Sequence, residues 1–281
     1  MNRTSTIYAF VCAVFFLSGC SSPAPFSRYL HADDIAGTHH FKKELVETNA
    51  FSVLVYSRIN SPGDDVNIYI EGDGLAWISR NRVSPDPTPR NPVALKLATT
   101  DSAMNVVYIA RPCQYVLATG NGRNCGKSDW TSGRFSEQVV ESINEVLSTV
   151  KKRSKSPGMN LIGYSGGGAV AVLVAARRND IRSLRTLAGN LDHEQFCRFH
   201  NVSALHESLN AIDKAKTIAQ IPQVHFVGAK DKIVPEEIAE NFVKAQGPEA
   251  CSEVVLVKDV SHGKGWEAAW PRLLKKTPYC P

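Results

Sequence analysis

The chain of 281 residues contains no long run of lysine or arginine, although its net charge is +5. Nucleic-acid binding is therefore not suggested, because proteins that bind phosphate backbones gather positive charge in patches. The sequence also lacks the ligand spacing of a metal site and the glycine-rich fingerprint of a dinucleotide site. No internal repeat is visible. We therefore expect no nucleic-acid partner, no metal and no organic cofactor.

The composition is that of an ordinary globular protein, with 43% hydrophobic and 21% charged residues. The length suits one large α/β domain or two small ones, and it is sufficient to bury a core. The sequence leaves the oligomeric state open.

The first residues have the pattern of a secretory signal. Arg3 supplies a positive charge, and residues 7–17 (IYAFVCAVFFL) form an apolar run. That run is too short to cross a bilayer as a helix, but its length suits a signal peptide.

The run leads into Leu17-Ser18-Gly19-Cys20, which resembles the lipobox of bacterial lipoproteins. The resemblance implies that residues 1–19 are removed and that Cys20 becomes a lipid-modified first residue. An ordinary signal with a chance cysteine is the alternative. Acyl chains at Cys20 would anchor the protein to a membrane. Because Ser21 rather than aspartate follows, the resemblance implies the outer membrane, facing the periplasm, with residues 20–37 as the lipidated cysteine and a tether.

Of the seven cysteines, two fall in the signal and at the lipidation site, which leaves five in an oxidising compartment, where disulfides persist. Cys113 and Cys125 flank a polar, glycine-rich loop, and we expect them to pair. A pairing of Cys251 with Cys280 is a weaker possibility, because connectivity does not follow from sequence alone. The odd count leaves one thiol, for which Cys197 is the candidate, and we expect that thiol to be buried.

Strands and helices are predicted to alternate along most of the chain. Apolar, β-branched runs predict strands at 41–47, 51–59, 66–70, 106–110, 159–164, 184–187, 224–227 and 254–257. Helices are predicted at 93–99, 135–152, 167–178, 235–245 and 266–276. This order predicts an α/β fold with one mostly parallel sheet covered by helices on both faces. The segment 189–219 interrupts the alternation, and we interpret it as a lid over a pocket, with surface helices as the alternative.

The stretch LIGYSGGGAV, residues 161–170, contains a G-x-S-x-G motif centred on Ser165. Such a motif arises by chance roughly once in ten chains of this length. Here a predicted strand precedes it and a helix of small residues follows, which is the strand–turn–helix context that the motif requires. In a turn this tight, a Cβ at Gly163 or Gly167 would clash, and the serine is held in strained backbone geometry.

A serine hydroxyl needs an adjacent base and an orienting acid to act as a nucleophile. Asp231 follows the predicted strand at 224–227, and His262 follows the last strand. Asp192, after the preceding strand, is the alternative acid. Each residue also has a structural interpretation: Ser165 as a turn residue, His262 as a surface histidine and Asp231 as a helix cap.

From about residue 40 onward, the elbow around Ser165, the Asp-x-x-Val-Pro segment at Asp231 and the final His-Gly resemble an α/β-hydrolase in order and spacing. The resemblance implies that residues 38–281 form the hydrolase domain. It also implies that Ser165 is the nucleophile, His262 the general base and then acid, and Asp231 the residue that orients His262.

The resemblance further implies an oxyanion hole formed by the Gly166 amide and the Asp73 amide, with Gly74 as the close alternative to Asp73. The family often has His-Gly where this chain has Glu71-Gly72. A carboxylate at Asp73 would disfavour an oxyanion unless it points away or pairs with an arginine.

The loop from 111 to 133 leaves the carboxyl end of a predicted strand, so it should border the pocket. The candidate rim residues are Arg111, Gln114, Tyr115, Trp130 and Arg134. A second loop at the same end carries Arg80, Arg82 and Arg90. A cationic rim would favour anionic substrates or lipid headgroups, and a solubilising surface is the alternative.

We therefore predict a lipid-anchored serine hydrolase that acts on a small-molecule or lipid acyl substrate, an ester or related compound, through an acyl-enzyme. An acyltransferase or peptidase on the same fold is one alternative, because fold does not determine function. A non-catalytic envelope lipoprotein is another. The sequence does not identify the substrate.

Overall fold

The computed structural model describes residues 25–280. The predicted signal at 1–19 and the lipidated Cys20 lie outside the described residues. Between 25 and 280, the chain forms no helix that is both long enough and apolar enough to cross a membrane.

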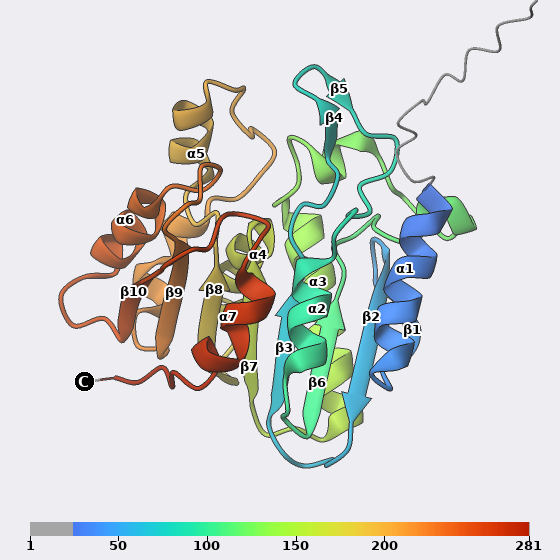
Figure 1. Ribbon diagram of the computed structural model, residues 1–281, viewed down its shortest axis with the longest axis horizontal. Coiled ribbons are helices and arrows are strands. Elements are labelled where there is room, and N and C mark those ends of the chain that lie inside the picture. The colour runs from blue at the N-terminus through green and yellow to red at the C-terminus, as the bar shows by residue number, and fades with distance from the viewer. Residues whose placement is uncertain (1–24, 281) are drawn as a thin grey trace, which may run out of the picture.

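The centre of the fold is an eight-stranded sheet with the order β1-β2-β6-β3-β7-β8-β9-β10 (Figure 1). β2 pairs antiparallel with β1 and β6, and every other neighbouring pair is parallel. The mostly parallel sheet predicted from the sequence is thereby confirmed. The strands are β1 (Lys42–Glu47), β2 (Ser52–Ile59), β3 (Val66–Ile70), β6 (Asn105–Ile109), β7 (Met159–Tyr164), β8 (Ile181–Leu187), β9 (Gln223–Gly228) and β10 (Ser252–Val257).

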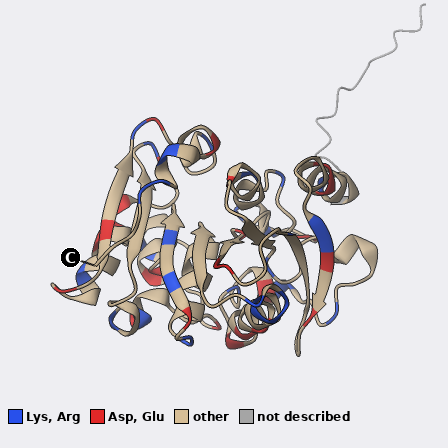
Figure 2. Ribbon diagram, turned by 90° about the horizontal axis from the view of Figure 1, so that it is seen from below, with Lys and Arg blue, Asp and Glu red and all other residues tan. Residues whose placement is uncertain are grey.

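Helices cover both faces of the sheet, as the view from below shows (Figure 2). One core cluster joins the strands to α3 (Glu137–Ser154), α4 (Gly166–Ala175) and α6 (Glu236–Gln246). The other joins them to α1 (Pro25–Thr38), α2 (Val93–Thr100) and α7 (Trp266–Leu273). Both clusters draw on the same strands because successive side chains point to opposite faces. A strand buried on both faces therefore reads as a continuous apolar run.

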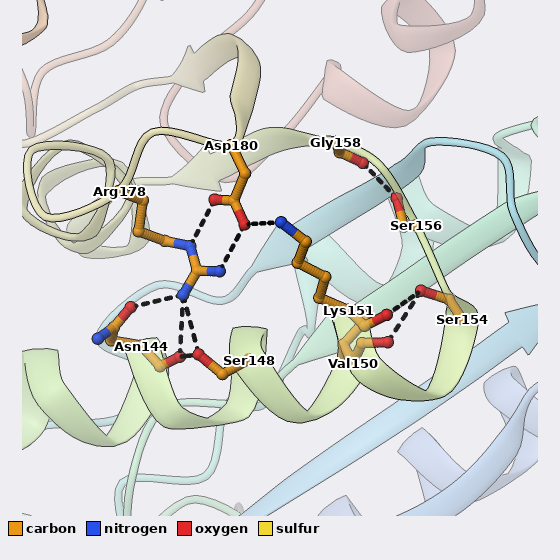
Figure 3. A network of polar contacts seen from close by, with 9 residues as sticks. All are labelled: Asn144, Ser148, Val150, Lys151, Ser154, Ser156, Gly158, Arg178 and Asp180. Atoms are coloured by element: carbon orange, nitrogen blue, oxygen red, sulfur yellow. Dashed lines mark hydrogen bonds and ion pairs between the residues drawn. The ribbon is translucent and has the colours of Figure 1, made fainter.

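The helix predicted at 135–152 begins at Glu137, because the Ser136 hydroxyl caps it by accepting a hydrogen bond from the Val139 amide. At its other end, a polar network attaches α3 to the turn before β8 (Figure 3). Asp180 in that turn accepts hydrogen bonds from Lys151 at 2.6 Å and from Arg178 at 2.8 Å. Burial alone would raise the pKa of Asp180, but these two cations outweigh it and lower the pKa to about 2.

The tether predicted at 20–37 is helical from Pro25 onward, so the folded part begins earlier than residue 38. Tyr29, Ala32 and Ala36 of α1 are buried and belong to the core cluster that the helix shares with the sheet. The Tyr29 hydroxyl also donates a hydrogen bond to Asp86 at 3.0 Å. This helix was not predicted from the sequence because its polar residues mask a narrow apolar stripe.

Two projections rise from the same end of the sheet (Figure 1). One follows β3 and is a small ribbon of β4 (Trp77–Ser79) and β5 (Arg82–Val83), in a region expected to be mainly loop. The other follows β8 and begins with α5 (His193–His200). The rest of the predicted lid, with η3 (Ala211–Lys214) and η4 (Lys216–Ile218), instead packs into the core through Ala211, Ala215 and Ile218.

Disulfides join Cys113 to Cys125 and Cys251 to Cys280, which are the two pairs considered from the sequence. Cys197 is a free thiol and is buried. The first disulfide closes the start of the segment 111–133, which also contains η1 (Leu117–Thr119) and η2 (Lys127–Trp130).

Candidate active site

Ser165 lies at the junction between β7 and α4, with φ 51° and ψ −121°. A positive φ is strained for a residue with a side chain, and such strain persists only where the surroundings impose it. A Cβ at Gly163 would lie 2.4 Å from the Gly167 oxygen, and one at Gly167 would lie 2.3 Å from the Ile70 oxygen. The steric role predicted for these two glycines is thereby confirmed.

Hydrogen bonds hold the backbone of this turn on both sides. The Ser165 amide donates to the Leu187 oxygen at 2.9 Å. The Ser165 backbone carbonyl oxygen accepts hydrogen bonds from the backbone amides of Gly168 at 2.9 Å and Asn190 at 3.1 Å. The turn is therefore attached to β8 and to the segment that follows it, which keeps the hydroxyl in place.

His262 bridges the other two residues of the predicted triad. Its Nε2 lies 3.1 Å from Ser165 Oγ, and its Nδ1 lies 2.9 Å from Asp231 Oδ2. An ionised carboxylate can only accept, so Nδ1 carries the hydrogen and Nε2 presents a lone pair to the serine hydroxyl. The structure thus brings together three residues that lie far apart in the sequence.

The Asp231 side chain is 0% exposed, although it stands in a surface turn after β9. Its second oxygen accepts hydrogen bonds from the amides of Ile233 at 2.8 Å and Val234 at 3.0 Å. Asp192, the alternative acid, instead caps α5 and accepts from Asn210 at 2.9 Å. The geometry therefore favours Asp231 over Asp192 as the partner of His262.

Two aromatic residues that the sequence analysis did not assign hold the backbone of His262. The Tyr164 hydroxyl donates to the His262 oxygen at 2.9 Å, and Trp266 Nε1 donates to the same oxygen at 2.8 Å. The Tyr164 ring also lies against the imidazole, with centroids 5.5 Å apart. The only sequence signal for Tyr164 was its position directly before Ser165.

The turn at 72–74 passes beside Ser165, where the second oxyanion donor was expected. A Cβ on Gly72 would lie 3.2 Å from the Ser165 Cβ. Gln114 Nε2 donates to the Gly72 oxygen at 2.9 Å and so supports the turn. Gly74 has φ 65°, and a Cβ there would lie 2.1 Å from the Pro87 oxygen, so only glycine fits.

The Asp73 carboxylate lies between two arginines. Its Oδ1 is 3.2 Å from Arg111 Nη1, and its Oδ2 is 2.9 Å from Arg134 Nη1. Burial disfavours ionisation of this carboxyl, but the two guanidinium groups outweigh it and lower the pKa of Asp73. The carboxylate also packs against Gly166, because a Cβ there would lie 2.0 Å from Oδ1. The arginine pairing that an oxyanion beside Asp73 would need is therefore present.

Glu71 is buried behind the same turn, with 1% of its surface exposed. Its carboxylate accepts hydrogen bonds from the Gly72 amide at 2.9 Å and the Tyr108 hydroxyl at 3.2 Å. It also accepts a longer one from the Ala94 amide in the first turn of α2. Burial raises the pKa of Glu71 to about 7, although these hydrogen bonds favour the ionised form.

A cavity of about 1290 Å³ opens over Ser165 and His262, between the β4–β5 ribbon and α5. Of the predicted rim residues, Arg134 lines it. The prediction was wrong for Arg111, Gln114, Tyr115 and Trp130, which are buried and do not line the cavity. These residues form hydrogen bonds behind the cavity wall. The side chains of Arg111, Gln114 and Trp130 donate to Asp73, Gly72 and Ser84, and the backbone amide of Tyr115 donates to the Thr88 hydroxyl.

One further polar side chain, Asn190, lines the cavity and is 3% exposed. Its side-chain oxygen has no hydrogen-bond partner in residues 25–280. Within that range, no group of three or more His, Cys, Asp or Glu side chains is arranged to hold a metal ion. The polar groups beside Ser165 include the His262 imidazole, the Asp73 carboxylate, the Arg134 guanidinium and the Asn190 carboxamide.

A sequence model of the family described as serine hydrolase (FSH1) matches residues 96–261. The match covers more than half of the chain and contains Ser165 and Asp231. It ends one residue before His262. The chain belongs to this family of serine hydrolases. The protein is thus an enzyme of the hydrolase class. No curated protein matches its sequence.

Solved structures share the fold of the hydrolase at low sequence identity. An α/β serine hydrolase homologue from Coxiella burnetii superposes with a TM-score of 0.53 and 20% identity, over 83% of this chain and 93% of that one. Est1E from Butyrivibrio proteoclasticus has a TM-score of 0.58 and 14% identity, over 83% and 96%. An esterase from Pyrococcus furiosus has a TM-score of 0.56 and 15% identity, over 85% and 92%. These likenesses show the α/β-hydrolase fold.

Proposed function

We propose that the protein hydrolyses a carboxylic ester or related acyl compound, with Ser165 as nucleophile, His262 as general base and acid, and Asp231 as the residue that orients His262. The observation that supports this proposal is the continuous hydrogen-bond chain from Ser165 Oγ through His262 to Asp231. A chain of this kind raises the nucleophilicity of an otherwise weak hydroxyl.

In the first half of the reaction, Ser165 Oγ attacks the acyl carbon while His262 Nε2 takes the hydroxyl proton. The carbonyl oxygen gains negative charge in the tetrahedral intermediate. The Gly166 amide, at the start of α4, and the Asp73 or Gly74 amide are the proposed donors to that oxygen. The carbon–oxygen bond to the alcohol then breaks, and the alcohol leaves with the proton from His262.

In the second half, water attacks the acyl-enzyme while His262 takes one of its protons. The bond to Ser165 Oγ breaks, and His262 returns that proton to the serine. The products are an acid and an alcohol, and the enzyme regains its starting state. Asp231 stays ionised throughout and stabilises the imidazolium that forms in each half.

Labelling by a serine-directed fluorophosphonate tests this proposal, together with hydrolysis of a short-chain para-nitrophenyl ester. We expect the wild-type protein to be labelled and active, and Ser165→Ala to be neither. The circular dichroism spectrum of each protein shows whether it is folded. If folded wild-type protein takes no label and hydrolyses no ester, the proposed function is wrong.

We further propose that the protein is lipid-anchored in the bacterial cell envelope, at the outer membrane and facing the periplasm. The support is the lipobox-like sequence Leu17-Ser18-Gly19-Cys20 and the cost of removing acyl chains from a membrane. Cys20→Ala is expected to release the protein from membrane fractions. Retention of wild-type protein with an unmodified Cys20, found by mass spectrometry, would contradict the anchor.

A further inference from the structure

Three arginines from separate segments line the cavity that contains Ser165. Arg80 comes from the turn between β4 and β5, Arg90 from the segment before α2, and Arg134 from the segment before α3. A cleft lined by one sign of charge attracts ligands of the opposite sign, because its low-dielectric walls focus the field. The tertiary structure, not sequence proximity, produces this concentration of charge.

Arg80 lines the cavity and is exposed to solvent. Its side chain reaches across to the segment after α5, where Nη2 lies 3.5 Å from the Asn201 oxygen. That long contact is its one hydrogen bond within residues 25–280. The guanidinium group therefore retains most of its donors for a ligand that enters between the two projections.

Arg134 also lines the cavity. Its Nη1 holds Asp73 and its Nε donates to the Thr131 oxygen at 2.8 Å. Its Nη2 bonds to no group within residues 25–280, and its side chain is 13% exposed. The Asp73 carboxylate that Arg134 holds packs against Gly166, the residue next to Ser165.

The acidic groups of the cavity lining neutralise only part of this positive charge. Asp73 is shared between Arg111 and Arg134, so this cluster of three side chains has a net charge of +1. Glu71 directs its carboxylate away, toward Gly72 and the start of α2. Tyr164, His200 and His262 are the other titratable groups of the lining, and His200 Nε2 donates a hydrogen bond to the Ile233 carbonyl oxygen at 2.6 Å.

The remaining walls are largely apolar. They include five apolar side chains. These come from the β4–β5 ribbon, from α5, from the segment after α5 and from the turn after Asp231: Trp77, Phe196, Val202, Leu205 and Ile233. A ligand that fills this cavity therefore needs an apolar body as well as an anionic group.

We propose that the substrate is an ester with an apolar body and an anionic group, which binds to the guanidinium groups of Arg134 and Arg80 while the scissile bond lies at Ser165. This inference rests on the proposed function, and it adds the class of substrate. An arginine donates hydrogen bonds to a carboxylate or phosphate in a fixed fork geometry, so the anion also orients the ester.

Two matched pairs of esters test the proposal. Mono-para-nitrophenyl adipate and para-nitrophenyl hexanoate differ by an anionic group on the acyl side. The hexanoyl esters of para-hydroxybenzoate and para-hydroxybenzamide differ by one on the alcohol side. We expect kcat/KM of the wild-type protein to be at least about tenfold higher for the anionic member of one pair, as a charged hydrogen bond is worth about 1.5–3 kcal/mol.

The variant Arg80→Gln is expected to reduce that preference about threefold, because exposed ion pairs contribute up to about 1 kcal/mol. Arg82→Gln is the matched control. It removes the same charge from the same ribbon, but Arg82 does not line the cavity, so the preference should not change. Arg134→Lys keeps a charge for Asp73 but removes the forked donor, and it should reduce the preference further than Arg80→Gln.

Inhibition of hexanoate-ester hydrolysis by hexanoate and by hexyl phosphate distinguishes the two kinds of anion. Stronger inhibition by one of them than by hexanol, weakened in Arg80→Gln, identifies the group that the cavity holds. The proposal is overturned if both wild-type preferences are absent, or if Arg80→Gln and Arg82→Gln change the preference equally. Loss of fluorophosphonate labelling and of all ester hydrolysis would overturn the proposed function as well, whereas neutral-ester activity without a preference overturns only the substrate class.

Discussion

The hydroxyl of Tyr164 donates a hydrogen bond to the backbone oxygen of His262 at 2.9 Å. The residue next to the nucleophile in sequence thereby holds the loop that carries the imidazole. The segments after β7 and β10 are far apart in the sequence. This hydrogen bond links them directly, and they carry Ser165 and His262. Hydrogen bonds that support the catalytic residues, without touching the substrate, determine how precisely those residues are positioned.

Removal of this hydroxyl in Tyr164→Phe should lower kcat about three- to tenfold, since a buried hydrogen bond contributes about 1 kcal/mol. KM for a small neutral ester should change less than kcat, because the variant alters the position of the base rather than the apolar walls. Tyr56→Phe is the control: it removes a hydroxyl bonded to Asp33, away from the cavity. Equal kcat values for Tyr164→Phe and wild type would show that the bond does not position His262.

The two candidate acids can be separated by substitution. Asp231→Asn should lower kcat by about ten-thousandfold, because the amide favours the wrong tautomer of His262. Asp192→Asn should leave the free energy of unfolding nearly unchanged, because asparagine caps a helix about as well as aspartate, and it should leave kcat within a few-fold of wild type. Steady-state kinetics and urea unfolding measure both effects. A large loss of kcat in Asp192→Asn alone would reverse the assignment.

The glycines that follow Ser165 should differ in their tolerance of a side chain. Gly167→Ala places a Cβ 2.3 Å from the Ile70 oxygen, a backbone atom that cannot move aside, so we expect a loss of about 3 kcal/mol. At Gly168 the nearest atom would be 3.0 Å away, and a gain in helix propensity of about 1 kcal/mol offsets the crowding. Denaturant midpoints compare the two variants. Equal destabilisation would show that the approach of α4 to β3 is not the reason for glycine at 167.

Glu71 should make stability depend on pH near neutrality. Burial raises its folded pKa from the ordinary value of 4.5 to about 7, so the folded state binds more protons than the unfolded state between these values. Its contribution to stability is therefore present at low pH and is lost as the pH rises through about 7. The cost of ionisation is about 3 kcal/mol from the same difference.

Glu71→Gln removes this titration. The free energy of unfolding of Glu71→Gln relative to wild type should therefore increase by about 3 kcal/mol between pH 4 and pH 8. Urea unfolding at several pH values measures the difference between the two free energies of unfolding. The contributions of the other titratable groups, which both proteins share, cancel in that difference. A pH-independent difference would contradict the buried, titrating state of Glu71.

Much of the fold could be predicted from the sequence because its signals are local. Strands buried on both faces read as apolar runs, so residues 66–70 and 159–164 were predicted with the bounds that β3 and β7 have. The order of Ser165, Asp231 and His262 also follows from positions just after predicted strands. The helix α1 was missed because much of its surface is polar, and its burial depends on contacts with β1 and α2.

The cavity lining was predicted less well, for a physical reason. A loop that leaves the carboxyl end of a strand can border the pocket or pack behind it, and the sequence of 111–133 does not distinguish these cases. Arg111 is buried because Asp73, from another loop, accepts its hydrogen bond. Arg134 instead reaches the cavity while it holds the same carboxylate.

The sequence by itself determined the parallel sheet, the strained turn at Ser165 and the chemical types available beside it, because periodicity, glycine positions and residue chemistry act over short distances. Only the tertiary structure decided which carboxylate meets His262, that Tyr164 holds its backbone, and that Arg80 and Arg134 enter one cavity. Those outcomes depend on distances between segments far apart in the chain, which are set by how the strands pair and how the loops pack.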